Sequence, residues 1–134
     1  MKYNKLKMTA CAAAALACLP LLQANAHHSI AGEFDQEVTI QLKGVLTAFD
    51  WANPHLWYYF DVTNANGQVE KWQCTTGTNP NRLLRAGWKK EDLVIGSVVV
   101  FDNANPARDS SNTCYTPNIA LEDGTRIFSG RREQ

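Results

Sequence analysis

The N-terminal segment decides how much of this chain is available to fold. Residues 1–7 carry three lysines and no acid, and residues 8–22 form an apolar run rich in alanine and leucine. The tripeptide Ala24-Asn25-Ala26 follows, which is the small-x-small pattern that a signal peptidase cleaves. We therefore predict a cleaved signal peptide over residues 1–26, a periplasmic location, and a single mature domain over residues 27–134.

Two other interpretations of this segment stay open. The apolar run is about 15 residues long, shorter than the roughly 20 that a membrane-spanning helix needs, so an uncleaved anchor is the less favoured alternative. A lipoprotein is the other alternative, because Leu16-Ala17-Cys18 faintly resembles a lipidation site. Once the signal peptide is removed, we expect no membrane span in the mature domain.

Cleavage changes the charge of the protein. The full chain has 13 basic and 13 acidic residues. Three lysines belong to the signal peptide, so the mature domain has 10 basic against 13 acidic residues and a net charge near −3. Nucleic acids and anionic membranes attract clustered positive charge, and we therefore expect no nucleic-acid partner.

Cleavage also leaves an even number of cysteines. Cys74 and Cys114 remain in the mature domain, and an even pair in an oxidising compartment predicts a disulfide. A redox-active pair would more typically be a Cys-x-x-Cys motif, which does not occur in this sequence.

Alternation between apolar and polar residues predicts a mostly β domain. Residues 37–51 alternate like a half-buried strand, with a bulge or bend expected at Gly44. Residues 55–62 and 69–75 form the next two strands, joined by Asn66-Gly67 in a tight type I′ hairpin. Further strands are expected over residues 97–101, 114–121 and 125–128, with a break at Pro117 in the second of these and a polar loop over residues 102–112.

One short helix is expected between the third and fourth strands. Asn79 can cap it, Pro80 suits its first position, and Gly87 ends it. This order of elements favours a small OB-like five-stranded antiparallel barrel with one short helix between strands 3 and 4. A small antiparallel sandwich is the alternative.

Aromatic residues gather around the turn that precedes the second strand and along one face of that strand. The opposite face, which begins at Leu56, has the apolar character of a core. The aromatic face is either a stacking platform for an unknown small ligand or a second covered face of the barrel. The candidate ligand-binding residues are Trp51, Asn53, His55, Trp57 and Tyr59.

Three histidines suggest a second kind of site. Cleavage after Ala26 makes His27 the N-terminus, and its amine and imidazole can then chelate Cu(II), with His28 or His55 as a further ligand. The alternative is structural: a polar chain end at His27 and His28, and a turn that His55 fixes by hydrogen bonding. Copper is the cofactor that this pattern would take.

Catalysis finds little support in the sequence. Asp50 or Asp61 could form an acid–base pair with His55. The sequence contains no nucleophile elbow, phosphate-binding loop, dinucleotide fingerprint or His-Glu-x-x-His motif. We therefore name no catalytic residue.

Five segments of the sequence form a recognisable set: Ala26-His27-His28-Ser29, Glu33-Phe34-Asp35, Trp51-Ala52-Asn53-Pro54-His55-Leu56-Trp57, residues 81–88 and residues 121–126. Together they resemble a known family of short exported bacterial proteins, the domain of unknown function 6152 family. The resemblance implies an exported protein of a Gram-negative bacterium with an OB-like fold, and it brings no established activity, substrate or cofactor. Cys74 and Cys114 are not part of the family pattern, which makes their bridge a local stabiliser.

Two functional hypotheses follow. The leading one is a non-enzymatic periplasmic binding or accessory module, whose partner is an unknown small ligand or a periplasmic protein. The second is a copper-binding protein built on His27 with His28 or His55.

Overall fold

The computed structural model describes residues 29–131. The predicted signal peptide and the two histidines that follow it, His27 and His28, lie outside the described residues. None of the helices in residues 29–131 is long and apolar enough to cross a membrane.

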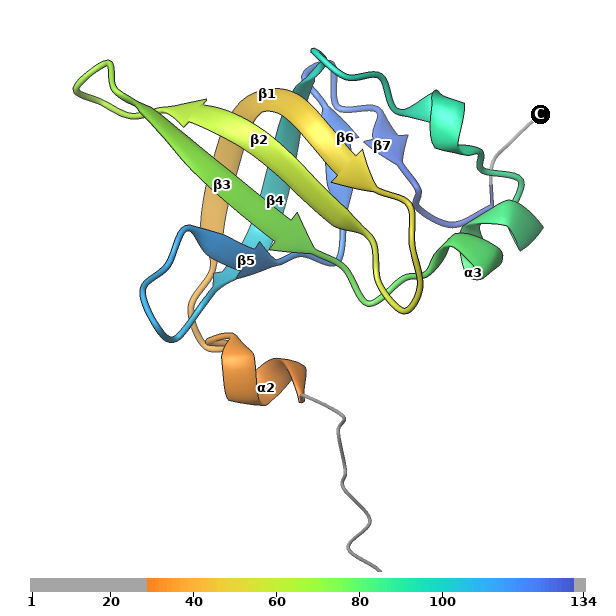
Figure 1. The fold of residues 1–134 in the computed structure, drawn as a ribbon, viewed down its shortest axis with the longest axis horizontal. Helices are drawn as coiled ribbons and strands as arrows, with labels where there is room; N and C mark the ends of the chain where they lie inside the picture. The colour runs from red at the N-terminus through yellow and green to blue at the C-terminus, as the bar shows by residue number, and fades with distance from the viewer. Residues whose placement is uncertain (1–28, 132–134) are drawn as a thin grey trace, which may run out of the picture.

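The described chain is mostly β, with short helices at its start and in its middle (Figure 1). In chain order the elements are α2 (Ile30–Glu33), β1 (Ile40–Asp50), β2 (Trp57–Thr63), β3 (Val69–Thr75), α3 (Pro80–Arg85), the 3₁₀ helix η1 (Lys90–Asp92), β4 (Val98–Pro106), β5 (Thr113–Tyr115), β6 (Ile119–Leu121) and β7 (Arg126–Ile127).

The strands β1 to β5 close into a barrel in the order β1-β2-β3-β5-β4 and back to β1. The long strand β1 closes it, because its first half pairs with β4 and its second half with β2. With α3 between β3 and β4, this is the OB-like barrel that the sequence predicts. One pairing differs from an all-antiparallel barrel: β3 and β5 run parallel.

Gly44 lies where β1 passes from β4 to β2. A Cβ atom at this position would lie 2.5 Å from the backbone oxygen of Asp61 and 2.9 Å from Cδ2 of Phe60. Glycine is needed here because another strand approaches closely. The register shifts expected at Gly44 instead fall on either side of it, one in the pairing with β4 and one in the pairing with β2.

The core fills the barrel, and the inner face of β2 supplies much of it. Leu56, Tyr58 and Phe60 are fully buried, as the alternation predicts. The ring of Phe101 lies 5.8 Å from that of Tyr58 and 4.4 Å from that of Phe60 between centroids. Such tilted aromatic pairs stabilise a core beyond the area that they bury.

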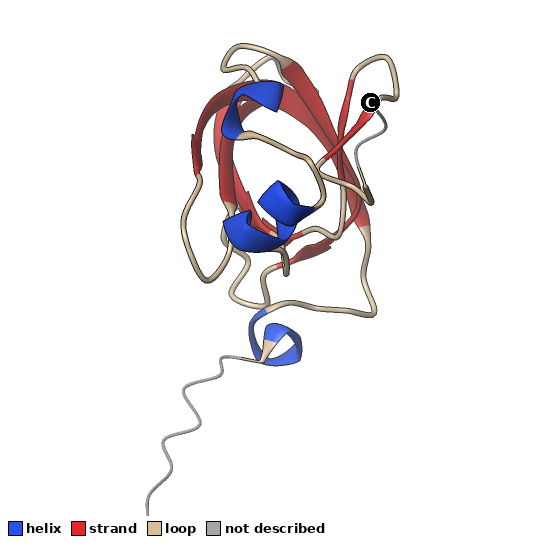
Figure 2. Ribbon diagram, turned by 90° about the vertical axis from the view of Figure 1, so that its right-hand side faces the viewer, coloured by secondary structure: helices blue, strands red, loops and turns tan. Residues whose placement is uncertain are grey.

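The helices α3 and η1 lie across one end of the barrel (Figure 2). The Asn79 side chain accepts a hydrogen bond from the backbone N–H of Arg82 at 3.0 Å, which confirms the predicted cap. Leu83 and Trp88 are buried below, and Trp88 Nε1 donates to the backbone oxygen of Gly130 at 3.1 Å. This contact fixes the last described residues against the same end.

Two elements, β4 and α2, depart from the sequence prediction. The strand β4 continues to Pro106 into the expected polar loop, because Ala104 is buried and pairs with Ile40 of β1. The break expected at Pro117 is confirmed: this part of the chain forms two strands, β5 and β6, and Pro117 between them has no N–H to donate. The helix α2, capped by Ser29, was not predicted, because it is too short to show a helical period.

The β2–β3 hairpin also turns differently. Gly67 N–H donates to the oxygen of Asn64 at 2.9 Å, and Gly67 has a φ of 77°. The turn is therefore centred before Gly67, with Gly67 as the left-handed residue of a longer loop, and not a two-residue type I′ turn. The resulting register pairs Tyr59 with Gln73.

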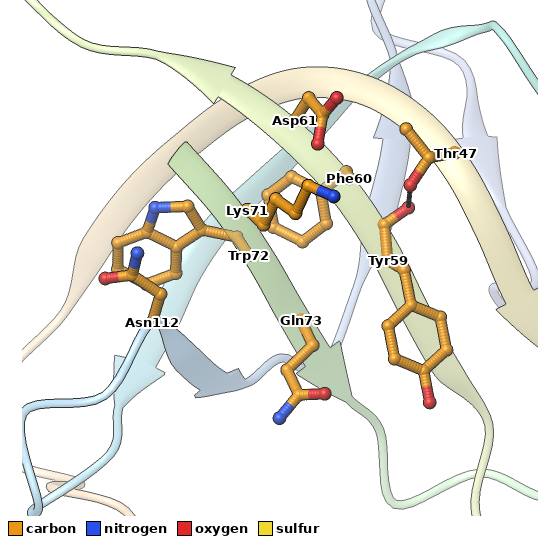
Figure 3. A pocket seen from close by; sticks show the side chains of 8 residues that line it. All are labelled: Thr47, Tyr59, Phe60, Asp61, Lys71, Trp72, Gln73 and Asn112. Carbon is orange, nitrogen blue, oxygen red and sulfur yellow. Dashed lines mark hydrogen bonds between the residues drawn. The ribbon is translucent and has the colours of Figure 1, made fainter. Parts of the chain in front are cut away.

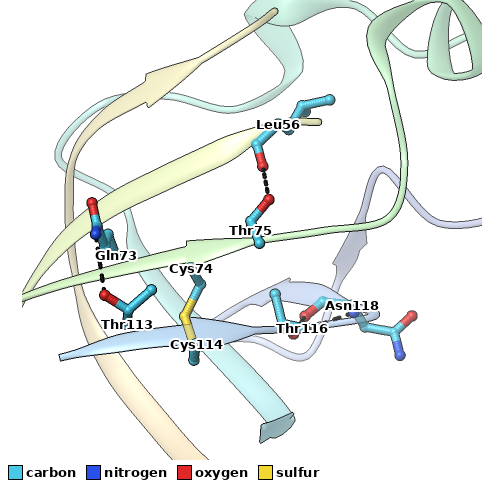
Figure 4. Close-up of a disulfide and its surroundings, with 8 residues drawn as sticks. All are labelled: Leu56, Gln73, Cys74, Thr75, Thr113, Cys114, Thr116 and Asn118. Atoms are coloured by element: carbon cyan, nitrogen blue, oxygen red, sulfur yellow. Dashed lines mark hydrogen bonds between the residues drawn. A yellow bond between two sulfur atoms is a disulfide. The ribbon is translucent and has the colours of Figure 1, made fainter. Parts of the chain in front are cut away.

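The predicted disulfide between Cys74 and Cys114 is present (Figure 4). Both residues are fully buried and lie opposite each other in the parallel pair β3–β5. Beside the bridge, Gln73 Nε2 donates to Thr113 Oγ1 at 3.1 Å on the outer face of the same strands. The disulfide and this hydrogen bond hold β5 against β3.

Candidate ligand-binding face

The structure divides the predicted ligand-binding residues among different places. His55 and Trp57 line one groove, and Tyr59 lines a separate hollow further along β2. Asn53 is exposed in the loop between β1 and β2. Trp51 is half-buried and packs on Phe128 with ring centroids 5.2 Å apart, at the barrel end that α3 covers.

Trp57 faces outward because its neighbours along the chain face inward. Leu56 and Tyr58 are fully buried, and successive side chains of a strand point to opposite sides. Thr75 Oγ1 donates to the backbone oxygen of Leu56 at 3.0 Å and so anchors the end of the β1–β2 loop to β3 (Figure 4). His55, before this anchor, is exposed at the rim.

The first groove, which we name the His55 groove, lies between α2, the β1–β2 loop and the ends of β3 and β5. Its volume is about 430 Å³. Phe34 and Tyr115 form part of its wall, with ring centroids 6.0 Å apart. The complete lining is Ile30, Glu33, Phe34, Pro54, His55, Trp57, Thr75, Thr76, Gly77 and Tyr115.

The second groove, the Arg108 groove, lies on the other side of Trp57. It has a volume of about 350 Å³ and shares Glu33, Phe34 and Trp57 with the first. The Arg108 guanidinium lies 3.7 Å from the carboxylate of Asp35, and its Nε donates to the oxygen of Ala31 at 3.2 Å. These contacts join the β4–β5 loop to the segment around α2.

The third hollow, the Tyr59 hollow, lies on the outer face of β2 and β3 (Figure 3). Its volume is about 390 Å³, and its lining is Thr47, Tyr59, Phe60, Asp61, Lys71, Trp72, Gln73 and Asn112. Tyr59 OH donates to Asp50 Oδ2 at 3.0 Å. Partial burial, and then the hydrogen bond and negative charge of Asp50, raise the pKa of Tyr59, so the hydroxyl keeps its proton at neutral pH.

Several polar groups of the Tyr59 hollow have no partner within residues 29–131. The Gln73 amide donates to Thr113, but its carbonyl oxygen accepts no hydrogen bond there. The Asn112 side-chain amide and the Lys71 ammonium make none either, and the Asp61 carboxylate has no ion pair. The hollow therefore offers both donors and acceptors to a ligand.

The three hollows adjoin one another. Trp57 separates the His55 groove from the Arg108 groove, and the consecutive residues Ser111, Asn112 and Thr113 line the Arg108 groove and the Tyr59 hollow in alternation. We name the three together the outer trough. It follows β2 on the outside of the barrel, bounded by the β1–β2 loop at one end.

Sequence reasoning missed much of this lining. Gln73 could have been found from the β2–β3 register, had the hairpin loop been assigned correctly. Phe34, Arg108 and Asn112 carry no periodic signal, because they come from a short helix end and an irregular loop.

The proposed metal ligands do not all fall within the structure. His55 is described, whereas His27 and His28 lie outside residues 29–131. Among the described residues, no group of three or more His, Cys, Asp or Glu side chains is placed to hold a metal ion.

Comparison with known proteins assigns this chain to a family. A model described as a family of unknown function, DUF6152, matches residues 14–116. No curated protein matches the chain. Two crystal structures of Rim1, the mitochondrial single-stranded DNA-binding protein of S. cerevisiae, are similar over 63% of this chain and 93% and 94% of theirs, with 17% and 16% identity and TM-scores of 0.47 and 0.46.

Proposed function

We propose that this chain, which belongs to the DUF6152 family of unknown function, is an exported binding module whose ligand occupies the outer trough. The module is non-enzymatic in this proposal, so the trough holds its ligand without transforming it.

The exposure of Trp57 carries the proposal. This side chain lies between two grooves and, within residues 29–131, makes no hydrogen bond or ring contact. The Trp57 ring is only partly buried in the free protein, so a ligand that stacks on it can bury the apolar surface that remains exposed.

The size and position of the trough support the same function. Each hollow lies within the roughly 300–1,000 Å³ range of small-molecule sites. The face of strands 2 and 3, with the flanking loops, is also where OB-like barrels bind ligands. Because one fold hosts many functions, the residues of the trough and not the fold must decide the ligand.

Export is supported by two features. The first is the leader pattern of residues 1–26. The second is the buried Cys74–Cys114 disulfide, since such bonds persist in oxidising compartments.

The experiment is an NMR titration of ¹⁵N-labelled protein recovered from the periplasm after expression of the full chain. The probe is the low-molecular-mass fraction of a periplasmic extract. We expect the indole N–H signal of Trp57 and the side-chain amide signal of Gln73 to shift, and the Gln73 response to be lost in the Trp57→Ala variant. The matched control is Val69→Ala, an exposed apolar residue of β3 near the hairpin, which should respond like the parent protein. A response that survives in Trp57→Ala would contradict the proposal.

Copper binding is a second candidate, favoured by one observation. Ile30, two positions after His28 in the sequence, lines the same groove as His55. An N-terminal His27 would supply an amine and an imidazole, and His55 a further imidazole. Native mass spectrometry of protein purified without chelators or a metal column tests this candidate. Adding one residue before His27 should sharply reduce Cu(II) affinity, and an unchanged affinity would exclude the amine as a ligand.

A further inference from the structure

We infer that the ligand of the outer trough is an uncharged oligosaccharide, held by stacking on Trp57 and Tyr59 and by hydrogen bonds to Gln73, Asn112, Lys71 and Asp61. This inference rests on the proposed function, because it names the chemical class that the same trough would take.

The side chains of the Tyr59 hollow match a ligand rich in hydroxyl groups. The carbonyl of Gln73 and the carboxylate of Asp61 accept hydrogen bonds, the ammonium of Lys71 donates them, and the amide of Asn112 does both. A hydroxyl group is a donor and an acceptor at once, so neighbouring hydroxyls of a sugar ring can engage such a mixed set. The ring of Tyr59 lies in the same hollow and offers an apolar face to the C–H side of the sugar (Figure 3).

A polyanion fits this surface poorly. A nucleic acid needs several cationic side chains along its backbone. In the Tyr59 hollow, Lys71 lies directly across the strand pair from Asp61, and Asp50 lies beside Tyr59. The mature domain also carries a net charge near −3. The balance of charge therefore favours a ligand without phosphate groups.

An extended peptide would lack its usual means of attachment along β2, where Trp57 and Tyr59 lie. Peptides that add to a sheet need a strand edge with unpaired N–H and C=O groups. Around the outer trough, β2 pairs with β1 and β3, and β3 pairs with β2 and β5. The strand β5 pairs only with residues Gln73–Thr75 of β3, so within residues 29–131 the β3 edge over Val69–Trp72 is free. The stretch of β2 from Trp57 to Asp61, which the trough follows, is paired on both sides, so a ligand there must be recognised by side chains.

The shape of the trough favours a chain of sugar rings over a single one. The trough runs past the residues from His55 to Asp61, a distance of about 20 Å at the rise of a β-strand. Trp57 and Tyr59 are two positions apart and point to the same side of β2. Their two aromatic rings can therefore stack on successive sugar units of the ligand. An apolar lipid tail of the same length would have to desolvate the free amides and charges of the Tyr59 hollow.

The test is an NMR titration of ¹⁵N-labelled protein, recovered from the periplasm as above, with neutral hexasaccharides of glucose, N-acetylglucosamine, mannose and galactose. We expect at least one of them to shift the indole N–H of Trp57 and the side-chain amides of Gln73 and Asn112. Removing one direct hydrogen bond should weaken binding about tenfold, so Gln73→Ala and Asn112→Ala should each raise Kd by about that factor.

The matched control is Gln41→Ala. Gln41 lies on β1 and, like Gln73, donates one side-chain hydrogen bond to a neighbouring strand, in this case to Asp102 Oδ1 at 2.5 Å. It does not line the trough, so this variant should bind the hexasaccharide as the parent protein does. Equal losses in Gln41→Ala and Gln73→Ala would show that the effect is structural and would overturn the assignment.

Other outcomes separate this inference from the proposed function. If no hexasaccharide shifts these signals but the periplasmic extract does, the oligosaccharide is wrong and the binding module stands. If neither shifts them, both are wrong. If a thymidine hexanucleotide or a neutral hexapeptide shifts the same signals and the sugars do not, the ligand class is wrong.

Discussion

The sequence predicts the direction of the Trp57 side chain but not its surroundings. The buried neighbours Leu56 and Tyr58 fix its direction, and an alternating sequence is enough to predict that direction. The sequence does not show what surrounds the ring. Phe34 and Arg108 reach it from segments that are far away in the chain, and only tertiary structure brings them together.

Gly44 permits the first prediction. We expect Gly44→Ala to lower the free energy of unfolding by about 1–3 kcal/mol, because the new methyl group would meet Asp61 and Phe60 at less than van der Waals distance. Urea unfolding measures the change. The control is Gly67→Asn, since Gly67 has a φ of 77° with open space around it, and asparagine tolerates this conformation. Equal losses for both variants would contradict the steric explanation.

Tyr58 permits a prediction about pH. Burial raises the pKa of Tyr58 in the folded protein above the value of about 10 that it has when unfolded. The folded state therefore keeps a proton that the unfolded state loses, and stability falls as pH rises above about 10. Tyr58→Phe should flatten this fall, as measured by urea unfolding at about pH 8 and pH 11. An equally steep fall in the variant would assign the effect to other groups.

At the scale of elements, the sequence predicts strand identity better than strand pairing. The bounds of β3 agree with the prediction, and α3 begins at the predicted cap. The break between β5 and β6 was predicted from Pro117. The hairpin turn was predicted wrongly, since it depends on which residues of β2 and β3 pair. Register then decides the site: it turns Gln73 outward into the trough and Cys74 inward toward Cys114.

The disulfide gives a prediction at this scale. The bridge spans 40 residues and joins β3 to β5. In the chain-entropy model, a loop of this length contributes about 4 kcal/mol of stability. We expect the double variant Cys74→Ala/Cys114→Ala to lose about that much in urea unfolding. A reducing agent should destabilise the parent protein and leave the double variant unchanged. Equal stability of the two proteins would contradict a structural role for the bridge.

For the whole molecule, closure of the barrel pairs β2 on both sides from Trp57 to Asp61, so side chains must recognise the ligand along this strand. The OB-like architecture could be predicted from the order of strands and the helix between strands 3 and 4. The outer trough could not, because its three hollows combine α2, the β1–β2 loop, the β4–β5 loop and the strands between them. These segments carry no common pattern in the sequence.

The net charge gives a prediction for the whole molecule. Binding of an uncharged ligand releases few counterions, so its affinity should change less than about twofold between 50 and 200 mM salt. Isothermal titration with the best hexasaccharide at the two salt concentrations measures this. A steep loss of affinity with salt would indicate an anionic ligand and contradict the side-chain chemistry argued for the trough.

The most direct measurement is the free energy of unfolding of Trp57→Ala, obtained by urea titration on the same sample used for the ligand titration. We expect a loss of about 1 kcal/mol, as is typical of a single substitution outside the core, together with loss of the ligand response. Phe60→Ala, in the core, serves as the reference and should lose about 3–5 kcal/mol. If Trp57→Ala loses as much as Phe60→Ala, or keeps the ligand response, then Trp57 belongs to the packing of the barrel and the outer trough is not the binding site.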